Sequence, residues 1–244
     1  MSSAPVLDVA SATPAGRRLD LVSSVDGSSP RWPTAVSVSW CPRALHVLFE
    51  CRDDLAWATF RRRDEPLWRE EVVEVFLAPV ESPEVLKSGR GPASYIELEV
   101  NSLGALFDAE VHNPDGLRST MSVDTAWDWP AIRWAAGRGR RRDDWWASLE
   151  LPWRGLGFAA EPPGLWFANF YRVERPGGPG VANARDAADV DDEYTAWSPT
   201  LVNPPDFHRP ERFGLLALDG VATLPAAGPA TRALIPQRES PHGD

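Results

Sequence analysis

The chain has 244 residues, 43% of them hydrophobic and 25% charged, which is enough apolar material for the core of one globular domain. The formal net charge of −10 would repel a phosphate backbone, so we exclude nucleic acid as a partner. A run of about 18 apolar residues, which a membrane span needs, is missing, so we expect no membrane contact. The first thirty residues lack a secretion signal, which predicts a cytoplasmic location, or a secreted one if a leader has been removed.

The two ends of the chain differ from its middle. Residues 1–18 and 221–244 are rich in Ser, Ala and Pro and show no apolar period. Such segments cannot bury enough apolar surface to offset the entropy of ordering them. We therefore predict two poorly ordered ends and a single domain over residues 19–220.

Short segments with alternating apolar and polar residues fill the middle of the chain. Such alternation predicts strands with one buried face. The predicted strands are Val36–Trp40, Leu45–Arg52, Val72–Leu77, Tyr95–Asn101, Ala105–Val111, Ile132–Ala136, Trp145–Leu151, Leu165–Glu174 and Phe213–Leu218. Many short strands with Pro and Gly between them, and no strand–helix–strand rhythm, predict an all-β fold. The expected architecture is a jelly-roll-like sandwich of two antiparallel sheets with about nine or more strands.

The two cysteines flank the turn Pro42-Arg43-Ala44. A hairpin about this turn sets Cys51 opposite roughly Thr34, and at ~3.3 Å per residue the sulfurs then lie about 20 Å apart. A disulfide cannot span that distance. We predict two free, mostly buried thiols.

A turn at Glu65-Pro66 delivers Trp68 into a strand that carries Glu74. The C–H face of a pyranose ring stacks on an aromatic face, and its hydroxyls need charged or amide groups at the rim. The pairing therefore indicates sugar binding. Trp68 could also be a packing residue, and the carboxylates of such a strand could form a solvated surface.

Four segments carry a family resemblance: EPLWREEVVEVFL at 65–77, YIELEVN at 95–101, WFANFYR at 166–172 and PDFHRPERFG at 205–214. Over roughly residues 20–219 the chain resembles family 9 carbohydrate-binding modules and their stand-alone relatives. The resemblance implies a jelly-roll sandwich, no catalytic activity, and a mono- or oligosaccharide ligand bound at a chain end. It also implies structural calcium, which many members hold.

In that family two aromatic rings clamp a terminal sugar. The resemblance places the rings at Trp68 and Phe207 and a hydroxyl-binding carboxylate at Glu74. Phe207 departs from the family's Trp and offers less stacking area. Glu99 stands where the family's best-known binders have an arginine, so a site lined by Glu74 and Glu99 is acidic unless Arg172 or Arg69 faces them. The remaining candidate ligand contacts are Asn101, Asn169, Arg172 and, at the rim, His208.

Two points in this assignment stay open. Asn169 and Arg172 have opposite parity on one strand, so without a bulge they face opposite sides and one of them is structural. The acidic run 186–193 offers the calcium candidates Asp189, Asp191 and Asp192. Such a run also fits a solvated loop, so no cofactor is certain.

Two other functions are weighed against sugar binding. A glycoside hydrolase could use Glu97 and Glu99, which point to one face about 7 Å apart. Neighbours on one strand, however, cannot straddle a scissile bond. A haem-binding sandwich would need axial Met or His ligands, and Met121 is the only internal methionine.

Overall fold

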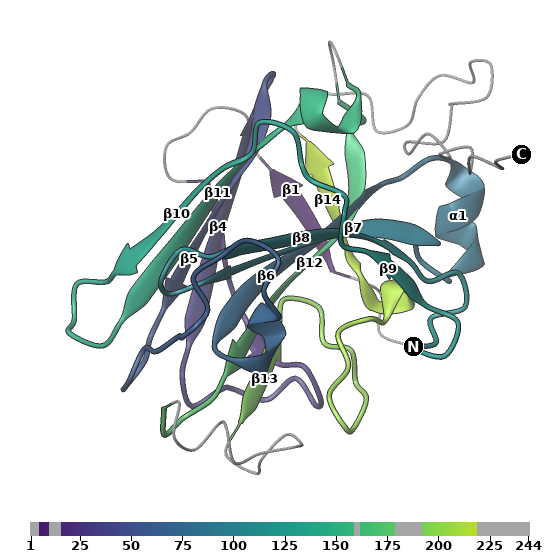
Figure 1. Cartoon of the computed structure of the whole chain (residues 1–244). Helices are drawn as coiled ribbons and strands as arrows, with labels where there is room; N and C mark the ends of the chain where they lie inside the picture. Colours follow the sequence, from purple (N-terminus) through teal and green to yellow (C-terminus); the bar gives the residue numbers. More distant parts are fainter. Residues whose placement is uncertain (1–4, 10–15, 159–161, 179–191, 219–244) are drawn as a thin grey trace, which may run out of the picture.

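A computed structural model describes residues 5–9, 16–158, 162–178 and 192–218 of the chain, and in it two β-sheets face each other (Figure 1). The larger sheet contains β1 (Val6–Val9), β3 (Val22–Ser23), β6 (Val72–Pro79), β7 (Ser94–Asn101), β8 (Leu106–His112), β9 (Ser122–Asp124), β12 (Leu165–Glu174), β13 (Glu193–Ala196) and β14 (Gly214–Leu218). The smaller sheet contains β2 (Arg17–Asp20), β4 (Thr34–Cys41), β5 (Ala44–Cys51), β10 (Arg133–Arg138) and β11 (Trp145–Pro152).

The order of strands in the larger sheet is β1-β14-β12-β6-β7-β8-β9, with β13 paired to β12 and β3 to β13. The smaller sheet runs β10-β11-β5-β4-β2. Within the described part of the chain all pairs are antiparallel except β1 with β14. The predicted two-sheet antiparallel sandwich is confirmed.

Each of the nine predicted strands is present with its ends within two residues of the prediction. The strands β1, β2, β3, β9 and β13 were not predicted, because two to four residues are too few for alternation to show. β1 and the start of β2 correct part of the prediction that residues 1–18 are poorly ordered. The predicted C-terminal tail, 221–244, lies outside the described residues.

The larger sheet has apolar side chains on both faces, and this places the site. On β6, Val73, Val75 and Leu77 point between the sheets into the main core. Phe76 points to the outer face, where a second apolar cluster includes Phe213 from the C-terminal loop. Because side chains alternate along a strand, the carboxylate of Glu74 shares this outer face with Phe76.

Short turns complete the frame. The predicted hairpin between β7 and β8 is present, and Gly104 takes a positive φ of 81° there. The β4–β5 hairpin sets Cys51 opposite Thr34, and both cysteines are free, as predicted. A short helix, α1 (Pro83–Ser88), lies beside the larger sheet (Figure 1). No helix in the described ranges is long and apolar enough to cross a membrane.

Candidate functional site

Trp68 stands at a cavity of about 480 Å³ on the outer face of the larger sheet. We call this the Trp68 cavity; it is lined by Trp68, Glu74, Glu97, Phe107, Arg118, Met121, Val123, Thr125, Val173, Arg175, Tyr194, Pro205, Phe207 and His208. The 3₁₀ turn Leu67–Arg69 carries the indole, and the fully buried Leu67 anchors that turn. Trp68 is 44% exposed, so part of the residue is open to a ligand.

Phe107 holds the Trp68 ring in place from the neighbouring strand β8. The two ring centroids lie 5.2 Å apart at 72°, an edge-to-face contact. The contact uses the edge of one ring and limits the rotation of the indole. A stacking surface that is fixed before the ligand arrives loses less entropy on binding.

Phe207 lines the same cavity from the C-terminal loop, but it is only 6% exposed. Its ring stacks on Tyr171, with centroids 4.1 Å apart and 16° between the planes. The Tyr171 hydroxyl also donates a 3.0 Å hydrogen bond to the Phe207 carbonyl oxygen. Phe207 is therefore a rigid wall of the cavity that offers a small contact area.

Three carboxylates meet at the sheet surface beneath the cavity, and we call Glu74, Glu97 and Glu99 the floor triad. The β6–β7 register sets Glu74 directly opposite Glu99 and Phe76 opposite Glu97. One oxygen from each of the three lies within 4.8 Å of the others. Glu74 and Glu97 line the cavity, whereas Glu99 is fully buried and does not reach it.

Burial raises the pKa of each carboxyl group of the floor triad, because the charged form is poorly solvated there. Repulsion from Glu97 raises the pKa of Glu74 further, and repulsion from Glu74 and Glu97 does so for Glu99. The pKa of Glu97 rises to about 7. The triad therefore does not carry three full negative charges at neutral pH.

His208 lines the cavity beside the floor triad. Its Nδ1 lies 2.8 Å from the Tyr95 hydroxyl oxygen, and its Nε2 lies 3.9 Å from a Glu97 oxygen. Burial and, to a smaller degree, the charge of Arg118 lower the His208 pKa to about 4. The imidazole is therefore neutral at neutral pH and can form a hydrogen bond with a ligand.

Two amides predicted to contact the ligand are used inside the fold instead. The Asn101 side chain accepts hydrogen bonds from the backbone N–H groups of Leu103 and Ala105 and donates to the Phe60 carbonyl oxygen. The Asn169 side chain is bound on both sides to the Ser198 backbone. Neither residue lines the Trp68 cavity.

Arg172 lies on the other side of the sheet from Asn169, as their opposite parity predicted. Its guanidinium is buried between the sheets and donates to Thr34 Oγ1 at 3.1 Å and to the Arg52 carbonyl oxygen at 2.6 Å. It also forms ion pairs with Asp53, at 2.7 Å, and with Glu174. The structure thus places Arg172 away from the Trp68 cavity, in a structural position.

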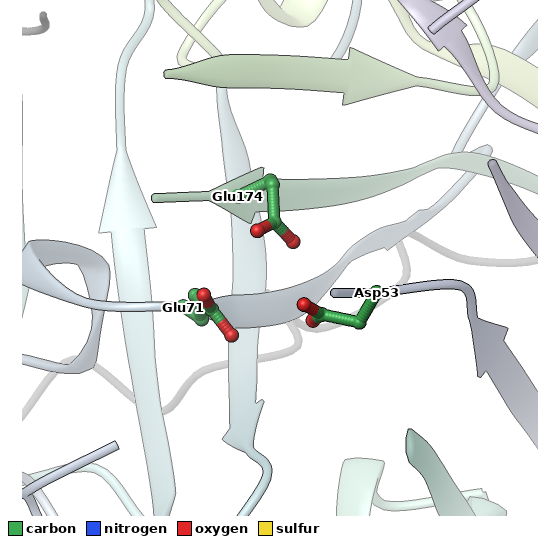
Figure 2. Close-up of side chains that lie close together, drawn as sticks. All are labelled: Asp53, Glu71 and Glu174. Carbon is green, nitrogen blue, oxygen red and sulfur yellow. The ribbon is translucent and has the colours of Figure 1, made fainter. Parts of the chain in front are cut away.

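Asp53, Glu71 and Glu174 form a second carboxylate triad around this guanidinium. Figure 2 shows the three side chains pointing toward one another, and one oxygen from each lies within 4.8 Å of the others. Burial is the main cause that raises the pKa of each of the three. We call Asp53, Glu71, Arg172 and Glu174 the Arg172 cluster.

In the Arg172 cluster the guanidinium takes the place beside the carboxylates that a bound metal ion would need. Asp53 accepts from Arg172 and from the Leu55 N–H, and Glu71 accepts from the Trp57 N–H. The guanidinium already supplies the positive charge between these carboxylates. Of the predicted calcium ligands, Asp189 and Asp191 lie outside the described residues, and Asp192 is paired with Arg175.

Several residues of the cavity were not predicted as ligand contacts. Glu97 and Phe107 could have been found, because alternation puts them on the same sheet face as Glu99 and Glu74. Arg118 and Tyr194 come from segments far along the chain and carry no local signal. The structure alone brings them to Trp68.

A second cavity, of about 580 Å³, lies beside α1. Its walls include apolar residues of the helix and of β7, such as Val85 and Ile96. Its two aromatic residues are the buried Tyr95 and the partly buried Trp127. With no half-exposed aromatic ring of the kind found at Trp68, it is the weaker candidate for a sugar.

No protein-family model matches the chain, and no curated protein matches it. Solved structures do match. A proposed carbohydrate-binding protein from Bacteroides uniformis ATCC 8492 aligns with a TM-score of 0.64 and 16% identity over 89% of this chain and 100% of that one.

Two further matches are structures of a family 9 carbohydrate-binding module from Caldicellulosiruptor kristjanssonii. The module in complex with cellotriose aligns with a TM-score of 0.53 and 14% identity over 89% of this chain and 95% of that one. The module in complex with glucose aligns with a TM-score of 0.53 and 13% identity over 89% and 97%. The similarity predicted from four sequence segments is thus confirmed at the level of the fold: this chain is built as the family 9 carbohydrate-binding modules are.

Proposed function

We propose that this protein is a non-catalytic saccharide-binding protein, with Trp68 as its main stacking surface. The observation that carries the proposal is the half-exposed indole at the mouth of a cavity lined by buried carboxylates. A cavity of about 480 Å³ lies within the usual size range of small-molecule sites. The fold neighbours include modules in complex with cellotriose and with glucose, which supports a saccharide ligand.

The polar residues around the cavity supply both kinds of hydrogen-bonding group that a hydroxyl needs. Glu74 and Glu97 can accept hydrogen bonds, and Arg118 and Arg175 can donate them. The neutral His208 ring can bond a ligand through Nε2, because its Nδ1 is already bonded to the Tyr95 hydroxyl. Walls on several sides favour a monosaccharide or the end of a sugar chain as the ligand.

A glycoside hydrolase is the second candidate, and one observation favours it. Glu97 has a pKa of about 7, as a general acid requires, and a second carboxylate lies close by. All three carboxylates of the floor triad, however, lie on adjacent strands of one sheet face. Because a hydrolase holds its two carboxyl groups on either side of the scissile bond, we prefer the binding function.

Calorimetric titration of the parent protein with a panel of mono- and oligosaccharides tests the proposal, with Trp fluorescence as a second readout. Glucose and cello-oligosaccharides belong in the panel because of the fold neighbours. We expect saturable binding to at least one sugar and no release of reducing sugar. Absence of binding across the panel, or hydrolysis of a glycan, would contradict it.

A further inference from the structure

The part of the chain that the structure describes contains two buried carboxylate triads, and they differ in one respect. In the Arg172 cluster, the guanidinium pairs with Asp53 and Glu174 and neutralises charge inside the protein. The oxygens of the floor triad also lie within 4.8 Å of one another, but this triad opens on a cavity. The Arg172 cluster thus contains its own cation, whereas a cation for the floor triad has to be looked for among the residues around it or in a ligand.

No Lys or Arg of the described ranges forms an ion pair with the floor triad. The two arginines of the cavity are engaged with other partners. Arg118 pairs with Asp206 at 2.8 Å, and Arg175 pairs with Asp192 and donates to the Trp68 carbonyl oxygen. Their charges lower the pKa of Glu74, and that of Arg118 also lowers the pKa of Glu97, but both effects are smaller than the effect of burial, which raises these pKa values.

Glu74 is the member of the triad best placed to contact a ligand. It is only 3% exposed, it lines the cavity, and no described group donates a hydrogen bond to it. Buried polar groups normally have a partner, because an unsatisfied carboxylate loses its hydration without compensation. The open side of Glu74 faces the space that a ligand would fill.

We propose that the Trp68 cavity binds a saccharide that carries a protonated amino group, whose ammonium pairs with Glu74 and Glu97 while the sugar ring stacks on Trp68. The inference rests on the proposed saccharide-binding function and names its ligand class. An ammonium has three donors and no acceptor, which matches a floor made of carboxylate oxygens. Charge-assisted hydrogen bonds in a shielded site are roughly twice as strong as neutral ones.

A neutral sugar fits this floor less well. Its hydroxyls bring no positive charge, so the crowded, buried carboxyl groups must keep their protons to avoid repulsion. An amino sugar brings the missing charge with it. Acetylation of the amine removes that charge and leaves the ring unchanged, so it provides a matched neutral ligand.

Calorimetric titrations of the parent protein with matched sugars test the inference. The ligands are glucose, glucosamine and N-acetylglucosamine, and the same three forms of galactose, so that the ring and the amine are varied separately. We expect the preferred ring to bind at least about tenfold more tightly as the amino sugar than as either neutral form. In Glu74→Gln and Glu97→Gln this ratio should fall toward one, whereas in Glu110→Gln, a carboxylate outside the Trp68 cavity, it should stay.

The outcomes distinguish a failure of the amino-sugar inference from a failure of the proposed saccharide-binding function. Binding of neutral sugars with no preference for the amine would overturn the inference and leave the proposed function intact. No binding by any sugar would overturn both. Calcium that binds the parent protein, competes with the sugar and is lost in Glu74→Gln would also overturn the inference, because the triad would then hold a metal ion.

Discussion

The guanidinium nitrogen Nη2 of Arg172 lies 2.7 Å from Oδ2 of Asp53, and both side chains are almost completely buried. Asp53 follows the smaller sheet, whereas Arg172 belongs to β12 of the larger sheet. The ion pair therefore joins the two layers of the sandwich. Since the same nitrogen also pairs with Glu174, the cluster depends on this one cation.

Arg172→Met is expected to destabilise the protein by about 3–5 kcal/mol, because it leaves buried carboxylates without their counter-charge. Urea unfolding followed by Trp fluorescence measures the change. Arg18→Met is the matched control, since the Arg18–Glu50 pair is exposed and should be worth at most about 1 kcal/mol. Equal losses of unfolding free energy in the two variants would show that the buried ion pair stabilises the protein no more than the exposed one.

Calcium should stabilise Arg172→Met more than it stabilises the parent protein. In Arg172→Met the triad of Asp53, Glu71 and Glu174 is free to take a divalent ion, so added calcium should raise the melting temperature of this variant. In the parent the guanidinium occupies that position, and the rise should be smaller. The comparison is made by thermal unfolding with calcium and with a chelator; a larger calcium effect on the parent would refute the interpretation of Arg172 as a built-in cation.

Glu97→Gln should alter the dependence of stability on pH. The folded-state pKa of Glu97, about 7, is above its ordinary value of 4.5, so the folded protein binds this proton more tightly than the unfolded chain. Its contribution is complete below pH 4.5 and is lost as the pH rises to 7. Over this pH window the free energy of unfolding of the parent should therefore fall by on the order of 3 kcal/mol more than that of the variant.

Urea unfolding at several pH values measures the difference in the free energy of unfolding between the parent and Glu97→Gln. The other charged groups that face Glu97 are Glu74, Glu99, His208 and Arg118. The variant keeps them but loses the repulsion by which Glu97 raises the pKa of Glu74 and Glu99, which adds to the difference in the same direction. His208, with its lowered pKa, contributes stability with the opposite sign as the pH rises, and this cancels in the difference. Parallel pH profiles for the two proteins would mean that Glu97 titrates normally.

Trp68→Ala should weaken saccharide binding by at least about 2 kcal/mol, as loss of an aromatic anchor usually does. The fold should survive, because the Trp68 side chain is only half-buried and Leu67 anchors its turn. Trp134→Ala is the control: this Trp is also exposed, at 36%, but does not line the cavity. Titration calorimetry compares the two, and equal affinities in Trp68→Ala and the parent would place the site elsewhere.

Asn101→Ala should lower stability by about 1–3 kcal/mol and leave the affinity for a saccharide unchanged. The substitution removes the acceptor of two hairpin N–H groups and the donor to the Phe60 carbonyl. Unfolding and titration on the same variant test both halves. Lost affinity with unchanged stability would instead make Asn101 a ligand contact.

Alternation along the strands made much of the site accessible from the sequence. It places Glu74 of β6 and Glu97 and Glu99 of β7 on one face, and the register then brings them together. It also separates Asn169 from Arg172. These are local properties, so a period of two residues is enough to reveal them.

The partners of these side chains could not be predicted in the same way. Arg172 has the residue type of a ligand contact, and only its long-range pairing with Asp53 shows its structural role. Asn101 looks like a free polar residue until the turn after it folds back on its side chain. Tyr194 and Arg118 come from irregular or short segments, whose approach to Trp68 is set by packing and not by any periodic pattern.

The parallel pairing of the first strand with the last gives the domain a mechanical property. Val6–Val9 lies alongside Leu215–Leu218 in register, and the N–H of Leu215 also bonds the Pro5 carbonyl oxygen. A pull on the two ends of such a pair draws the strands past each other lengthwise, so all the bonds between them bear the load together. Tension applied to both ends of the domain would therefore load this strand pair in shear, whereas β6 and β7, which carry the floor triad, are separated from β14 by β12.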